Sequence, residues 1–237
     1  MLSPKMISDE NPQPIRIKFK KVGMLRYISH LDLQRTFSKV LVRSGIPTWY
    51  TKGFNPHVKM VFSLPLSLGT QSECEFLDIR LREHMTCGEI LYRLNSTLTD
   101  ELSVLEVYEP EMKFQDIGYA EYDLKIITDG ASEELAERAR ELFAKGPIMM
   151  LKHSKSGDKE IDISPLIKRI NIEFCENDGA LCINAVLSAV PDNYLSPEML
   201  VGAMKSALGI LSTDILRERY SIMRKKVLLS DGETEFR

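Results

Sequence analysis

Cysteine is scarce in this sequence, with four residues among 237, and no two of them stand two residues apart. Zinc ribbons and thiol redox motifs need cysteines paired at that spacing, so neither class is indicated and no metal site is expected. Three of the four cysteines, Cys74, Cys175 and Cys182, fall in strand-like runs. We expect them to be small buried hydrophobic residues rather than metal ligands.

Long hydrophobic runs and the common catalytic motifs are also missing. No stretch approaches the roughly 20 apolar residues that cross a bilayer, and the first residues lack the apolar core of a signal peptide. We therefore expect a cytoplasmic protein. The sequence contains no Walker lysine loop, no G-x-G-x-x-G after a strand, and neither H-E-x-x-H nor G-x-S-x-G, so no cofactor is expected.

Acidic residues are nearly absent from residues 11–60, and this absence is the most informative feature of the chain. The stretch contains ten Lys and Arg residues and one acid, Asp32, which gives it a formal charge of +9. The whole chain has a charge of −3, so the remainder sums to −12. Because ordinary surfaces intersperse both signs, a one-signed stretch predicts contact with a polyanion such as a nucleic acid.

Residues 15–109 show a β-α-β-β-α-β pattern, the order of the ferredoxin-like fold. Residues 15–20 alternate apolar and basic side chains, which predicts a strand with one buried face and one solvated basic face. Ser29 and Asp32 form a capping-box variant that opens a helix, and Gly45 ends it. The remaining predicted elements are strands at 48–51, 59–64 and 73–81, a helix that opens at Thr86, and a strand at 103–108.

A similar order repeats in residues 119–237, after a linker at 110–118. The dipeptide Ser196-Pro197 is typical of a helix start, and Asn177-Asp178-Gly179 indicates a hairpin. We therefore predict an α+β protein of two ferredoxin-like halves packed together, preceded by a flexible tail at residues 1–14. The predicted elements of the second half are strands at 119–128, 148–153, 169–175, 180–188 and 220–229, and helices at 132–145 and 196–209.

The basic stretch contains the residue types that bind nucleic acids, because Lys and Arg bind phosphates and aromatic rings stack on bases. Arg35, Lys39 and Arg43 form one stripe on the predicted helix. The turn-rich segment that follows either presents Phe54 and His57 to a ligand or buries Phe54 as a plug. The candidate nucleic-acid-binding residues are Arg16, Lys18, Arg26, Arg35, Lys39, Arg43, Lys52, Phe54, Asn55, His57 and Lys59, with Tyr50 as a second stacking residue.

Three residues near the predicted helix start, Tyr27, His30 and Lys21, are of the types that cleave RNA by acid–base chemistry, and His57 is a further candidate. A lone histidine is seldom catalytic, because a general base needs a partner at hydrogen-bond distance. We therefore expect a protein without catalytic activity. Metal-independent RNA cleavage through His30 or His57 is an alternative.

Three motifs resemble one bacterial family: R-I-K-F-x-K-x-G-x-L-R-Y-I-S-H-L-D-L at 16–33, G-I-P-x-x-Y-T-K-G-F-N-P-H at 45–57 and S-L-P-L-S-L-G-T-Q-S-E-C-E-F-L-D at 63–78. They are similar to those of the radical-SAM-associated proteins, a domain of unknown function. The resemblance implies an accessory role beside a separate radical SAM enzyme in RNA or ribosome-related modification. This chain has no C-x-x-x-C-x-x-C to hold the enzyme's iron–sulfur cluster. The residues that match the pattern include Arg26, Tyr27, His30, Asp32, Lys52, Gly53, Phe54, Asn55, Pro56 and His57.

Together these features predict a non-catalytic RNA-binding adaptor that works with a separate radical SAM enzyme. Two alternatives remain. One is the RNA endonuclease described above, and the other is a protein–protein interaction module whose basic face binds an acidic surface.

Overall fold

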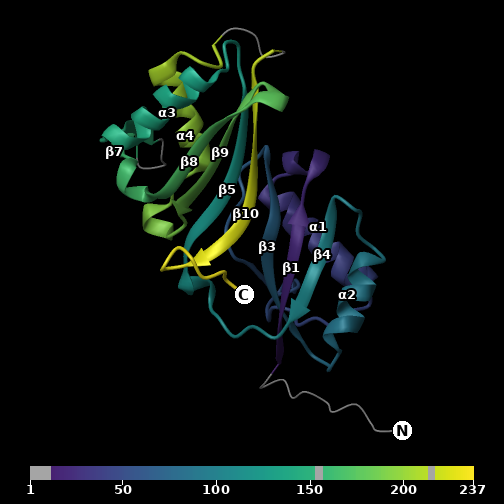
Figure 1. Ribbon diagram of the computed structural model, residues 1–237. Helices are drawn as coiled ribbons and strands as arrows, with labels where there is room; N and C mark the ends of the chain where they lie inside the picture. Colours follow the sequence, from purple (N-terminus) through teal and green to yellow (C-terminus); the bar gives the residue numbers. More distant parts are fainter. Residues whose placement is uncertain (1–11, 153–156, 213–216) are drawn as a thin grey trace. The chain divides into compact units, whose positions relative to one another are not determined.

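The computed structural model describes residues 12–152, 157–212 and 217–237 (Figure 1). The chain forms two compact units. The first comprises the residues up to Phe114 together with Arg237, and the second comprises Gln115–Phe236. Of the predicted tail, residues 1–11 lie outside the described part, whereas Gln13 and Pro14 already belong to the first strand. No helix among the described residues is long and apolar enough to cross a membrane.

The first unit is an antiparallel sheet in the order β4-β1-β3-β2, with two helices. This is the ferredoxin-like order, so the α+β pattern predicted for this half is confirmed. Figure 1 shows α1 and α2 in this unit beside β1 and β4. The elements are β1 (Gln13–Lys21), a 3-10 turn η1 (Gly23–Tyr27), α1 (His30–Arg43), β2 (Met60–Phe62), β3 (Thr70–Leu81), α2 (Cys87–Asn95) and β4 (Leu102–Tyr108).

The helix starts of the first unit follow the sequence signals. The Asp32 N–H donates to the Ser29 side chain, and the Glu89 N–H donates to the Thr86 side chain. Each cap satisfies a backbone donor that the helix itself leaves unpaired. Gly45 follows α1 with φ 62°, a left-handed conformation that favours glycine.

The core of the first unit lies between the sheet and its helices. The apolar residues of β1 face inward as the alternation predicts, and Phe19 and Phe37 place their ring centroids 4.7 Å apart. Burying such side chains supplies most of the unit's stability, at about 1.5–3 kcal/mol each. The fully or nearly fully buried members include Ile15, Ile17, Phe19, Leu33, Phe37, Leu41, Leu77, Ile90 and Leu94.

The second unit repeats the arrangement, with an antiparallel sheet in the order β10-β5-β9-β8. Its helices are α3 (Glu133–Lys145) and α4 (Pro197–Leu208), and short 3-10 turns lie at Phe114–Asp116, Ser164–Leu166, Glu176–Asp178 and Pro191–Asn193. The strands are β5 (Ile117–Ile127), β6 (Met149–Lys152), β7 (Lys159–Asp162), β8 (Ile167–Cys175), β9 (Ala180–Ser188) and β10 (Arg219–Leu229).

One predicted strand of the second unit has a different role from the one expected. The strand at 148–153 was placed in the repeated order, but β6 pairs with β7 in a separate two-stranded sheet. The position equivalent to β2 of the first unit is taken by β8. Residue 153 lies outside the described part of the chain.

The prediction that Cys175 and Cys182 are buried hydrophobic residues is wrong. Both are half-buried, and a disulfide joins them. They flank the tight turn at Gly179, and the β8–β9 register pairs Cys175 with Ala180 and Glu173 with Cys182. The two cysteines are therefore diagonal neighbours across the hairpin, a relation that their separation in sequence does not reveal. Cys74 is buried, as predicted, and is in no disulfide.

Candidate nucleic-acid interface

The basic residues of β1 do not form a solvated basic face, so this expectation is wrong. Arg16 is 1% exposed and binds Asp78 through two bonds, Nε to Oδ1 at 2.7 Å and Nη2 to Oδ2 at 2.8 Å. Lys18 Nζ lies 3.6 Å from Glu106 Oε1. The register places Arg16 opposite Asp78 and Lys18 opposite Glu106. Acids from β3 and β4 therefore pair with Arg16 and Lys18 of β1.

The basic stripe of α1 is exposed. Arg35 Nη1 lies 3.2 Å from Asp32 Oδ1, one turn earlier. Lys39 and Arg43 are exposed and have no acidic partner among the described residues. Surface pairs such as Arg35–Asp32 contribute little to stability, so α1 keeps two unpaired cations and one partly compensated cation.

After α1 the chain forms a hairpin, which we call the 48–59 hairpin. The Thr51 N–H donates to the His57 carbonyl at 2.8 Å, and the Lys59 N–H donates to the Trp49 carbonyl at 2.9 Å. Phe54 occupies the tip and is fully exposed, at 103%. Of the two alternatives for this segment, the buried plug is wrong and the exposed ring is correct.

The histidine of the hairpin supports the shape of the tip. His57 Nδ1 lies 3.1 Å from Thr51 Oγ1 and 3.3 Å from the Asn55 carbonyl oxygen, while the His57 N–H donates to Thr51 Oγ1. All these partners are neutral. Asn55, like Phe54, is exposed, so the tip presents an amide and an aromatic ring together.

Two arginines that the sequence analysis missed adjoin the hairpin. The Trp49 N–H donates to the Arg80 carbonyl at 2.7 Å, and the Arg82 guanidinium lies 5.6 Å from the centroid of the Tyr50 ring. Both arginines are exposed and have no acidic partner in the described segments. Both arginines lie outside the basic stretch at residues 11–60. They adjoin the hairpin only because residues 48–50 lie beside the end of β3. The resulting basic hairpin surface consists of Lys52, Phe54, Lys59, Arg80 and Arg82.

The Arg26–His30 segment lies elsewhere, at the beginning of β3. The Gly69 N–H donates to the Arg26 carbonyl at 2.9 Å. His30 meets Phe62 edge to face at 5.2 Å between ring centroids, and its Nε2 lies 3.1 Å from Gln34 Nε2. Lys21, suggested as a catalytic companion, is only 2% exposed.

In the described contacts, His30 and His57 meet neither each other nor the other proposed catalytic residues. Tyr27 is exposed and contacts the Arg26 guanidinium, whose carbon lies 4.7 Å from the ring centroid. His30 contacts Phe62 and Gln34, and His57 contacts Thr51 and Asn55, so in the described contacts neither histidine is hydrogen-bonded to a charged side chain. No group of His, Cys, Asp and Glu in the described segments is arranged to hold a metal ion.

Comparison with known proteins identifies the family. The model of a family described as "Uncharacterized protein conserved in bacteria (DUF2344)" matches residues 14–197. The chain belongs to this family. No curated protein matches the chain. A solved structure described as "Crystal Structure of a Cbf5-Nop10-Gar1 Complex" is 10% identical, with a TM-score of 0.49, and the match covers 95% of this chain and 55% of the solved one.

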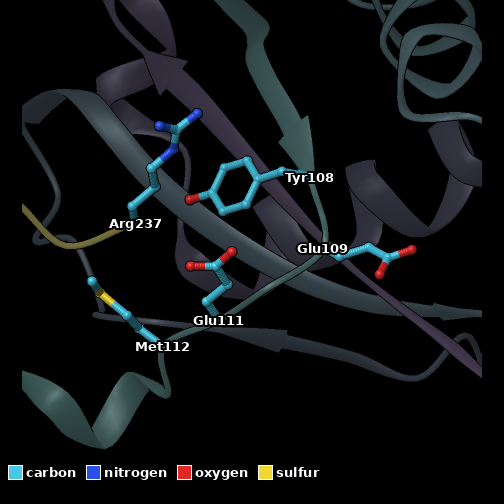
Figure 2. A pocket seen from close by; sticks show the side chains of 5 residues that line it. All are labelled: Tyr108, Glu109, Glu111, Met112 and Arg237. Carbon is cyan, nitrogen blue, oxygen red and sulfur yellow. The ribbon is translucent and has the colours of Figure 1, made fainter.

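The DUF2344 chain also has a small pocket in its first unit, of about 300 Å³, lined by Tyr108, Glu109, Glu111, Met112 and Arg237. Figure 2 shows the Tyr108 hydroxyl between the side chains of Glu111 and Arg237. Burial raises the pKa of Tyr108 to about 12. Two carboxylates line a pocket at the small end of the range for ligand sites, and they disfavour phosphate. None of the predicted nucleic-acid-binding residues lines it.

Proposed function

We propose that this DUF2344 protein is a non-catalytic adaptor that binds RNA through the basic hairpin surface and presents it to a separate radical SAM enzyme. The enzyme partner is suggested by the resemblance of the motifs at 16–33, 45–57 and 63–78 to the radical-SAM-associated family. The observation that carries the RNA part is the hairpin itself. It carries exposed Lys52 and Lys59 together with a fully exposed phenylalanine, Phe54.

Electrostatics favour a polyanion at this surface. The sequence contains no acid between Asp32 and Glu73, and Arg80 and Arg82 add to the same cluster. Lys and Arg bind phosphates by releasing counterions, with a slope of about −0.7 in log affinity against log salt for each phosphate on a single strand. Four such contacts correspond to a slope of about −3.

The exposed ring favours unpaired bases. A base can stack on Phe54 only if it is free of its own stack and pairing partner, as in single-stranded RNA. The ring projects from a hairpin whose backbone is tied to β3 through Trp49 and Arg80, so little conformational freedom of its backbone is lost on binding.

The test is a fluorescence-anisotropy titration of a labelled 16-nucleotide uridine-rich RNA at several salt concentrations. The double variant Lys52→Glu/Lys59→Glu should weaken binding at least tenfold and flatten the salt slope. Arg138→Glu/Lys205→Glu is the matched control, because it changes the charge equally at exposed positions of the second unit. Equal losses in both variants, or no RNA binding by the natural chain, would contradict the proposal.

A further inference from the structure

A second exposed surface lies where β1 ends and α1 begins. Four large apolar side chains are more than half exposed there: Met24 at 68%, Tyr27 at 55%, Leu31 at 53% and Leu68 at 59%. The bond from the Gly69 N–H to the Arg26 carbonyl holds the loop that carries Leu68 against η1. We call these four residues and Arg26 the η1 patch. Clustered exposed apolar side chains of this kind mark interaction sites.

Arg26 gives the patch a polar anchor. Its guanidinium stacks on Tyr27 at 4.7 Å, and its Nε–H is buried and has no hydrogen-bond partner. No acid of the described residues forms an ion pair with it. The nearby acids have other partners. Asp32 binds Ser29 and Arg35. Glu101 accepts a hydrogen bond from the Met24 N–H. A carboxylate from another molecule would complete the site, because guanidinium and carboxylate match in geometry.

The backbone beneath the patch is fixed before any partner arrives. The Gly23 N–H donates to Gln71 Oε1 at 2.8 Å. Gly23 has φ 61°, a conformation that strains other residues, and a Cβ there would displace the Glu101 side chain, whose Oε1 would lie 2.1 Å away. A preorganised surface binds with a smaller loss of conformational entropy.

The composition of the η1 patch separates it from the RNA surface. Arg, Tyr and Met are the residue types enriched at the centres of protein–protein interfaces. The basic hairpin surface adjoins the end of β3 at Arg80, whereas the η1 patch adjoins its start at Thr70. β3 has 12 residues, which corresponds to roughly 40 Å of strand.

We propose that the η1 patch docks a partner-protein segment that places a carboxylate beside a large apolar side chain. The apolar side chain packs among Tyr27, Leu31 and Leu68, and the carboxylate pairs with Arg26. This inference rests on the adaptor function and deepens it, because an adaptor needs a protein-binding surface distinct from its RNA-binding surface.

The experiment is selection of 12-residue peptides from a phage-displayed library on the full-length protein, followed by anisotropy titration of the best synthetic peptide. We expect the selected peptides to carry Asp or Glu within three residues of Leu, Ile, Met, Phe or Trp. Arg26→Ala and Leu68→Ser should each weaken peptide binding at least tenfold. Tyr92→Ala, which removes an exposed ring from α2, should change it less than twofold.

Several results would overturn the inference. The selection would contradict it if no sequence were enriched or if the enriched peptides lacked a carboxylate. The titrations would contradict it if Arg26→Ala and Leu68→Ser left peptide binding unchanged, or if RNA displaced the peptide. Circular dichroism and a thermal melt check that each variant is folded, and Leu68→Ser changes only an exposed side chain. RNA titration of the same variants distinguishes the two proposals. Lys52→Glu/Lys59→Glu should lose RNA and keep the peptide, and Arg26→Ala should do the reverse.

Discussion

Replacing Phe54 with alanine tests whether the exposed ring of the basic hairpin surface stacks on an unpaired base. Stacking of one base on an aromatic side chain is worth about 1–3 kcal/mol, which corresponds to roughly a 5- to 150-fold loss of affinity on truncation. The ring is fully exposed, so the substitution removes no core packing. The free energy of unfolding should change by less than about 0.5 kcal/mol.

The assay compares two labelled RNAs of equal length, one single-stranded and one fully paired. Phe54→Ala should weaken binding of the single strand within the stated range and change duplex binding by less than twofold, because paired bases cannot reach the ring. Phe54→Trp should restore binding of the single strand, since a larger aromatic face stacks at least as well. The salt slope should stay the same, because no phosphate contact is removed.

Two results would refute the stacking argument. The first is equal loss for single strand and duplex, which would mean that the tip supports the hairpin rather than contacts a base. The second is unchanged RNA binding combined with lost binding to anionic phosphatidylserine vesicles. An aromatic ring flanked by lysines also suits a membrane surface, and this result would assign the tip to lipid.

Two further predictions concern the first unit. Arg16→Ala should lower the free energy of unfolding by about 3 kcal/mol in urea titrations, at the lower end of the range for a broken buried ion pair, because Asp78 is partly exposed. Absorbance titration should show that Tyr108 ionises near pH 12 instead of 10.0, since burial disfavours its phenolate. The unfolded chain loses that proton at lower pH, so the free energy of unfolding should fall as the pH rises from 10 to 12. The fall should be smaller in Tyr108→Phe, which has no phenol to ionise.

Local signals in the sequence located most elements of the fold. The side chains of Ser29 and Thr86 cap the helices that they predicted, and the alternation of β1 correctly predicted its buried face. Both are contacts within a few residues, where spacing alone fixes the geometry. The order of elements then sufficed for the ferredoxin-like arrangement, because few sheet topologies satisfy short antiparallel connections.

The pairing of residues on different strands could not be predicted from these local signals. Arg16 meets Asp78 and Lys18 meets Glu106 only because β1 lies between β3 and β4. The Cys175–Cys182 disulfide likewise depends on the register of one hairpin. Strand order and register determine these partners, and spacing in the sequence does not predict them.

The charge of residues 11–60 is therefore a poor measure of the charge that a partner meets. Folding neutralises Arg16 and Lys18 and leaves Lys52 and Lys59 exposed at a hairpin. It also places Arg26 at an apolar patch, where its Nε–H has no hydrogen-bond partner and where we propose that a partner's carboxylate binds. One basic stretch thus yields two surfaces of different chemistry at opposite ends of β3, and a single polyanion does not satisfy both. That division is what the proposed adaptor function requires, because an adaptor has to bind RNA and a protein partner at the same time.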